Sequence, residues 1–217
     1  MAYEGPQDSD YANVRALNEE YLRLVKADTA QLGLPADLRR RFEALGRRQL
    51  DWLAKVPFLL FSLQENDPDK WQQLLADQVN EDLFRSRPTP ANEFAYLVTM
   101  TAGFLWQLAQ ENQYSARLFS GSPTAWCTLL ANTPYVDLVS RVRQHADLLT
   151  LRDAGNRNLW TRLLTQGVSA EPDIRGSAHI AALQMLLTTI QATDSWAVAA
   201  CNSRPIVARQ RDGQRRQ

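Results

Sequence analysis

Apolar residues near the amino terminus recur every three or four positions, which is the spacing of one face of an α-helix. The first such stripe begins after Ser9 and consists of Val14, Leu17, Tyr21, Leu24 and Val25. Gly33 is expected to end this helix, because glycine readily takes the left-handed conformation that closes a helix. Pro35 then suits the first turn of a second helix.

The same spacing predicts two short helices over residues 35–45 and 47–55, separated by Gly46 and closed before Pro57. An apolar run at 58–61 follows, and periodicity alone leaves it as either a buried strand or a helical turn. Asp67-Pro68 opens a further helix, whose apolar stripe consists of Trp71, Leu74, Leu75, Val79 and Leu83.

A proline-rich segment, Arg87-Pro88-Thr89-Pro90, is the clearest linker in the chain. After it the pattern predicts a long helix that carries Phe94, Leu97, Met100, Phe104, Leu105 and Leu108. Further helices are expected to start at Pro123 and Pro134, and to cover 156–166 and 175–192. A second apolar run, at 148–151, resembles the one at 58–61.

Proline and glycine stand between these segments, and no convincing alternation of apolar and polar residues indicates a long strand. The predicted fold class is therefore all-α. We expect a helical bundle or array of about 8–10 helices from two related halves, with at most short β pieces near 58–63 and 147–152. The predicted domains are a first half at 1–87, a second half at 91–203 with extra carboxyl-terminal helices, and a flexible basic tail at 204–217.

A ten-residue pattern, Pro-x-x-Trp-x-x-Leu-Leu-Ala-Asp/Asn, occurs at 68–77 and again at 123–132. Trp160 begins a shorter echo of it, with a Leu-Leu pair at the same spacing. Internal similarity of this kind indicates helices built to one plan and packed on each other. The three tryptophans are expected to be core anchors, with a partner-binding groove as the alternative.

One stretch resembles a known family through the residues Gly33-Leu34-Pro35, Leu38, Phe42, Ala44-Leu45, Gln49-Leu50, Leu53-Ala54 and Leu59-Leu60-Phe61. It is similar to FlhD, a subunit of the bacterial flagellar master regulator. The second half repeats the plan more loosely with Tyr96-Leu97, Gly121, Trp126, Leu130, Leu138 and Leu148-Leu149-Thr150-Leu151-Arg152. The resemblance implies two FlhD-like units in tandem, and an all-α regulator that acts with other proteins at promoters.

Charge is balanced over the chain, with 24 Lys+Arg and 24 Asp+Glu, so any basic surface has to be local. The candidate binding residues are the arginines of the two short helices, Arg39, Arg40, Arg41, Arg47 and Arg48. These helices have helix-turn-helix proportions, and arginines at this density can neutralise phosphates or meet an acidic partner. The alternative is a solvated helix face whose arginine stems cover apolar neighbours.

A second basic stretch lies in the tail and consists of Arg204, Arg209, Arg211, Arg215 and Arg216. It is interpreted as either a phosphate-binding arm or a solubilising end.

His145 and His179 have no second metal ligand nearby in sequence, and Cys127 is expected to be a core residue rather than the nucleophile of a Cys127–His145 pair. The sequence therefore predicts no catalytic residue, no metal and no cofactor, and it does not favour an enzyme.

The amino terminus lacks the apolar core of a signal peptide, and no apolar run is long enough for a transmembrane helix. We therefore expect a cytoplasmic protein with no membrane association.

The leading hypothesis is a bacterial regulatory protein that acts through a protein partner or as a homodimer, with DNA as a further candidate partner. The alternative hypothesis is a helical adaptor or chaperone-like module without a nucleic-acid role, which should expose an apolar groove.

Overall fold

The computed structural model describes residues 5–27, 29, 33–76 and 93–193, with the backbone alone at 189–193. In chain order the elements are α1 (Asp8–Ala27), α2 (Ala36–Glu43), α3 (Arg47–Leu53), β1 (Phe61–Ser62), α4 (Pro68–Ala76), α5 (Glu93–Glu111), α6 (Gln113–Ser120), α7 (Thr124–Asn132), α8 (Tyr135–Val142), the 3-10 turn η2 (Ala146–Leu148), β2 (Thr150–Leu151), α9 (Arg157–Thr165) and α10 (Pro172–Thr193). The prediction of an all-α fold with short β pieces is confirmed.

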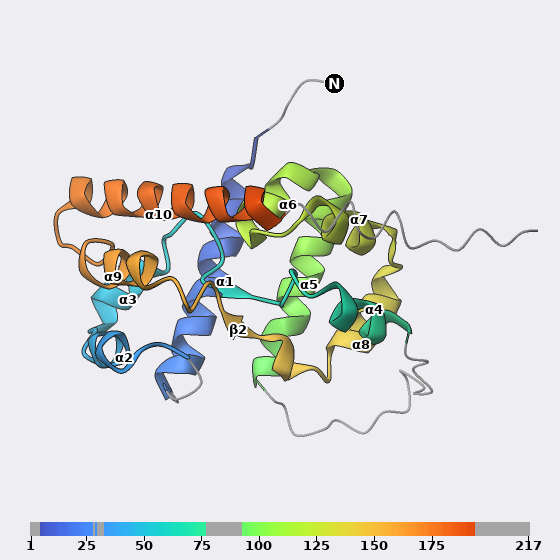
Figure 1. The fold of residues 1–217 in the computed structure, drawn as a ribbon, viewed down its shortest axis with the longest axis horizontal. Coiled ribbons are helices and arrows are strands. Elements are labelled where there is room, and N and C mark those ends of the chain that lie inside the picture. The colour runs from blue at the N-terminus through green and yellow to red at the C-terminus, as the bar shows by residue number, and fades with distance from the viewer. Residues whose placement is uncertain (1–4, 28, 30–32, 77–92, 194–217) are drawn as a thin grey trace, which may run out of the picture.

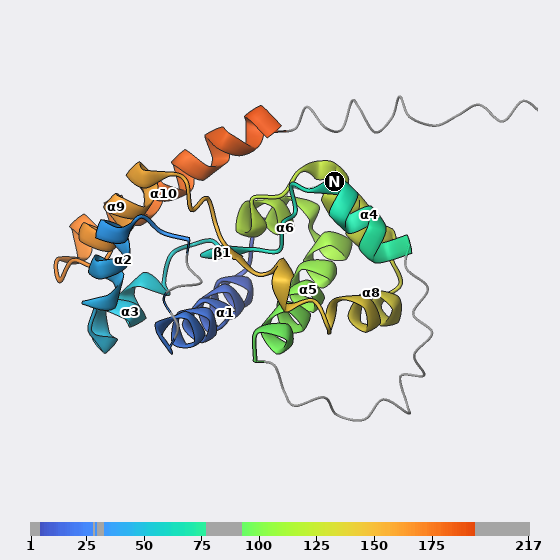
Figure 2. The ribbon, with the colours of Figure 1, turned by 60° about the horizontal axis from the view of Figure 1, so that its bottom comes forward.

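The long helices α1 and α5 lie side by side in the middle of the molecule, next to the strand pair (Figures 1 and 2). The helices α2, α3 and α9 form one end, and α4, α7 and α8 form the other. The last helix, α10, starts beside α9 and runs along one side of the molecule toward α6. The chain therefore has two ends built from short helices around a shared centre.

The long helix α5 carries the predicted apolar residues and ends at Glu111, and a separate helix, α6, follows it. Asn112 produces this break, because its side chain accepts a hydrogen bond of 3.1 Å from the backbone N–H of Ser115 and caps α6. The apolar pattern did not predict α6. Two earlier predictions, the continuation of the fourth stripe through Val79 and Leu83 and the linker at 87–90, lie outside the described residues.

Two short helices begin in the same way, after a Gly-x-Pro sequence. Gly33 and Gly121 both have left-handed backbones, with φ of 63° and 67°. Each is followed two residues later by a proline that precedes the first helical residue, at Pro35 for α2 and at Pro123 for α7. Glycine is required at these turns because a side chain strains a positive φ.

The two strands continue into two similar turns and helices. Gln64 after β1 and Asp153 after β2 share a left-handed backbone, with φ of 57° and 48°. The indole N–H of Trp71 in α4 donates to the carbonyl eight residues earlier, at 3.1 Å. Trp160 in α9 makes the same bond to the carbonyl of Arg152, at 3.0 Å. Each strand is thus fastened to the helix that follows it by the same contact.

The strand pairing is symmetric between the two segments. In the antiparallel register Phe61 pairs with Leu151 and Ser62 pairs with Thr150, so the first residue of each strand faces the second of the other. Helices then pack across this pair: α9 contacts α2, and α4 contacts α8. Trp71 of α4 also meets Trp126 of α7 edge to face, with ring centroids 5.2 Å apart.

The core runs continuously through both ends and the centre. Trp71, Trp126 and Trp160 are all fully buried, as expected for core anchors. Asn18, a buried polar residue of α1, connects α1 to the segment before β1. Its side chain donates to the carbonyl of Phe58 and accepts from the N–H of Leu60, both at 2.9 Å. The segment before β1 thereby gains partners for backbone groups that would otherwise be buried unsatisfied.

Candidate functional site

The arginine-bearing helices α2 and α3 are joined by a tight turn at Gly46. The N–H of Gly46 donates to the side-chain carbonyl of Gln49 at 3.0 Å, and the Gly46 carbonyl accepts from the backbone N–H of Gln49. Leu38 and Phe42 of α2 and Leu53 of α3 are buried against the core. Because these apolar residues face inward, the arginines at the intervening positions are directed toward solvent.

Lys26, near the end of α1, fixes the carboxyl end of α2. Its ammonium group donates to the carbonyls of Phe42, Glu43 and Leu45, at 3.1, 2.6 and 3.1 Å. The last carbonyls of a helix have no partner within it, and a cation there also complements the helix dipole. The α2–α3 turn is therefore anchored to the centre of the molecule.

Arg40, Arg41, Arg47 and Arg48 are exposed, and Arg39 is half-buried. Within the described part of the chain, none of these five arginines forms an ion pair. The two acidic residues of α2 have other partners: Asp37 pairs with Arg157, and the Glu43 carboxylate accepts from the hydroxyl of Thr29 at 2.7 Å. The positive charge of the five arginines is thus available to an external anion.

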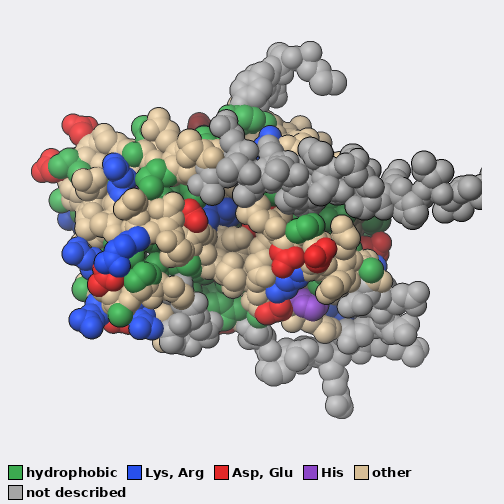
Figure 3. All heavy atoms as spheres, viewed as in Figure 1, with side chains coloured by type: hydrophobic (Ala, Val, Ile, Leu, Met, Phe, Trp, Pro, Cys, Tyr) green, Lys and Arg blue, Asp and Glu red, His purple; other side chains and the backbone are tan. Residues whose placement is uncertain are grey.

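Helix α9 brings two more arginines to the same end. It packs on α2, and its Arg157 and Arg162 are exposed. Figure 3 shows Lys and Arg side chains gathered over the end that contains α2, α3 and α9, with a few acidic side chains among them. Sequence reasoning missed Arg157 and Arg162 because they lie far along the chain, and only the packing of α9 on α2 brings them here.

Trp52 of α3 is contacted by two guanidinium groups. The side chains of Arg48 and Arg175 each lie over its indole ring, both 4.9 Å from the ring centroid. Arg175, at the start of α10, also donates to the carbonyl of Ser169 at 2.7 Å. Cation–π contacts of this kind restrain an arginine without neutralising it. Arg48 is therefore held in place while its charge remains available.

The remaining candidate residues lie elsewhere. The His145 ring nitrogen lies 3.4 Å from the Asp147 carboxylate, and the buried His179 ring is 2.9 Å from the Gly167 carbonyl. The described residues contain no group of three or more His, Cys, Asp or Glu side chains arranged to hold a metal ion. Cys127 is buried, with its sulfur 3.1 Å from the hydroxyl of Ser122.

The tail arginines at 204–216 lie outside the described residues, so the structure does not place them relative to α2 and α3. Each helix in the described part of the chain falls short of the length or apolarity needed to cross a lipid bilayer. Comparisons of this chain with family models, with curated proteins and with solved structures gave no match.

Proposed function

We propose that this protein is a regulator that acts through contacts with other macromolecules, and that its α2–α3 surface contacts the phosphates of DNA. The observation that carries the proposal is the set of five arginines at one end of the molecule without acidic partners among the described residues. Arginines of this kind release counterions from DNA when they bind its phosphates, which is the main source of sequence-independent affinity.

The dimensions of α3 are compatible with this role. Arg47 and Arg48 occupy its first turn, and its seven residues span roughly 10 Å. The major groove of B-DNA, about 12 Å wide, admits a helix of this kind, with the amino-terminal residues closest to the bases. The arginines of α2 and Arg162 of α9 would then meet the flanking phosphates, which position a protein but do not read sequence.

The tandem arrangement implied by the resemblance to FlhD is part of the same proposal. Three features support it: the Gly-x-Pro starts of α2 and α7, the shared turn after each strand, and the matching indole bonds of Trp71 and Trp160. In this proposal α2 corresponds to α7, α3 to α8 and α4 to α9, so the ten-residue pattern shared by α4 and α7 relates two helices that are not counterparts. The two halves would then be divergent copies that pair within one chain.

The proposal is tested by fluorescence anisotropy of the full chain with random duplex DNA over a series of salt concentrations. The variant Arg47→Ala/Arg48→Ala should weaken binding and make the slope of log K against log salt shallower by about 2, one for each lost phosphate contact. The matched control is Arg15→Ala/Arg23→Ala, which removes two exposed arginines that are ion-paired on α1. It should leave both the affinity and the slope nearly unchanged.

Three outcomes would contradict the proposal. Absence of binding at low salt would remove the nucleic-acid role altogether. Equal losses for the α3 variant and the α1 control would mean that overall charge, rather than the α2–α3 surface, determines binding. Binding to an acidic peptide but not to duplex DNA would instead assign the same arginines to an acidic protein partner.

The adaptor hypothesis is the second candidate function, and one observation favours it. The structure contains an open apolar groove between α1, α5 and α8. This groove is formed by other elements than the arginine surface, so the two roles are compatible in one molecule.

A further inference from the structure

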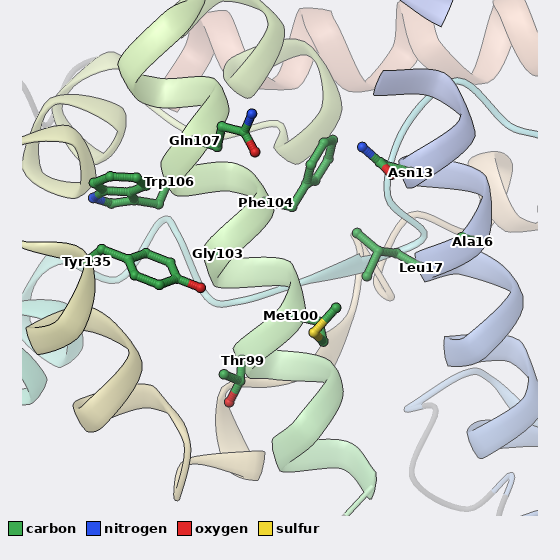
Figure 4. A pocket seen from close by; sticks show the side chains of 10 residues that line it. All are labelled: Asn13, Ala16, Leu17, Thr99, Met100, Gly103, Phe104, Trp106, Gln107 and Tyr135. Atoms are coloured by element: carbon green, nitrogen blue, oxygen red, sulfur yellow. The ribbon is translucent and has the colours of Figure 1, made fainter. Parts of the chain in front are cut away.

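An open groove of about 580 Å³ lies along α5, with α1 on one side and α8 on the other (Figure 4). Its lining residues are Asn13, Ala16, Leu17, Thr99, Met100, Gly103, Phe104, Trp106, Gln107 and Tyr135. Along α5 the lining extends over residues 99–107, a rise of roughly 12 Å, which matches two turns of a helix laid against it. None of the lining residues is charged.

The wall formed by Trp106 and Tyr135 is fixed before any partner arrives. The two rings pack at 5.1 Å between centroids, and the indole N–H of Trp106 donates to the carbonyl of Thr133 at 2.8 Å. Gly103 makes room for this wall, because a Cβ there would lie 3.3 Å from the Tyr135 hydroxyl. A preformed wall lowers the entropic cost of binding.

Large apolar side chains are exposed in and around the groove. Met100 is 50% exposed within it, and Tyr96, one turn earlier on α5, is 63% exposed. On α8, Tyr135 and its neighbour Val136 are 47% and 58% exposed. A cluster of exposed apolar side chains on adjacent helices is typical of a surface that another chain covers.

The helices that form the groove carry carboxylates next to its lining. Asp10 lies one turn before Asn13 on α1, and Glu111 of α5 accepts a hydrogen bond of 3.2 Å from the side chain of Gln107. Within the described residues neither of these two carboxylates forms an ion pair. The arginines on the exposed side of α1 are neutralised, since Arg15 pairs with Glu19 and Arg23 with Glu20.

We propose that this groove binds an amphipathic helix of a partner protein, and that the helix carries Lys or Arg beside its apolar face. The uncharged floor would accept apolar residues at the i, i+3, i+4 and i+7 positions. The flanking carboxylates would select basic neighbours by charge complementarity. This site goes beyond the proposed phosphate contact and does not depend on it.

The test uses the full chain and two synthetic helical peptides with the same Leu positions, one with Lys and one with Glu at the polar positions. Peptide binding is measured by fluorescence anisotropy at moderate salt. The Leu/Lys peptide should bind and the Leu/Glu peptide should not. Met100→Gln should weaken the Leu/Lys complex about tenfold, as expected for a central apolar contact. Glu111→Gln should weaken it less and reduce its salt dependence.

The control variant is Ile180→Gln, which replaces an equally large side chain that is 59% exposed on α10. It should leave peptide binding unchanged. The proposal is overturned if both peptides bind alike, or if Met100→Gln and Ile180→Gln have the same effect. It is also overturned if sedimentation shows self-association that Met100→Gln abolishes, which would make a second copy the occupant. A chain ending at Thr193 that binds the peptide over tenfold more tightly would make the protein's own tail the occupant.

Discussion

Arg152 is a buried cation that connects both halves of the chain. Its guanidinium donates to the carbonyls of Leu59 and Phe61, both at 2.6 Å, and lies 3.5 Å from the buried Glu65 carboxylate. Burial lowers the pKa of Arg152, and the neighbouring Glu65 charge opposes that shift. The Arg152 carbonyl in turn accepts from the Trp160 indole. A single residue therefore links the segment around β1 to α9.

We expect Arg152→Leu to lower the free energy of unfolding by about 3–5 kcal/mol, because it leaves a buried carboxylate without its cation. The double variant Arg152→Leu/Glu65→Leu should recover part of this loss, since it removes the unpaired charge as well. Urea unfolding of the wild type and of both variants measures the difference. A double variant less stable than Arg152→Leu would contradict the assignment of the loss to the Glu65 charge.

His179 gives the molecule a pH-dependent contact between α10 and the loop before it. Burial lowers its pKa below the usual range, so the folded state favours the neutral ring. In the unfolded chain the ring takes up a proton near pH 6.5, and the unfolded state then binds more protons than the folded state. The contribution of this residue to stability is therefore complete above that pH and decreases as the pH falls.

The matched variant for this effect is His179→Gln, which cannot titrate. Because carboxylates also affect stability in acid, the quantity to compare is the difference in unfolding free energy between wild type and variant. We expect that difference to shift in favour of the variant between pH 7.5 and pH 5.5. A difference that is constant over this range would show that His179 titrates alike in both states.

At the scale of elements, the three helices with a Trp-x-x-Leu-Leu sequence use their tryptophans differently. The indole N–H groups of Trp71 and Trp160 each reach a carbonyl just after a strand, at Leu63 and Arg152. The indole N–H of Trp126 has no hydrogen-bond partner in the described part of the chain, although its ring packs on Trp71. The repeated sequence therefore preserves burial of the ring but not its hydrogen bond.

These differences predict an order of stability for Phe substitutions. Trp71→Phe and Trp160→Phe each leave a buried carbonyl unsatisfied, which costs about 1–3 kcal/mol in addition to lost packing. Trp126→Phe loses packing alone and should destabilise the protein least. Thermal or urea unfolding of the three variants provides the measurement, and a Trp126→Phe variant as destabilised as the other two would contradict this account.

At the scale of the molecule, the two candidate surfaces occupy corresponding positions in the two proposed halves. Arg47 and Arg48 begin α3, whereas the exposed Tyr135 and Val136 begin α8. If the halves are copies, the first half carries positive charge at the start of α3, and the second half exposes apolar side chains at the corresponding start of α8. This difference agrees with one surface for phosphates and another for a partner helix.

Local sequence determined the helices, their boundaries at glycine and proline, and the burial of the three tryptophans. These features depend on spacing and backbone preference within a few residues, so a pattern along the chain is enough to predict them. The break at Asn112 was missed because capping by one side chain leaves little trace in the apolar pattern.

Only the tertiary structure decided which distant residues share a surface. The pairing of Asp37 with Arg157 joins positions 120 residues apart. Because Asp37 pairs with Arg157, it does not neutralise the neighbouring arginines of α2. The Trp52 contact with Arg175 and the groove beside α5 likewise depend on how helices pack. Sequence spacing specifies the face of each helix, whereas packing between helices specifies which faces meet and which remain open to a partner.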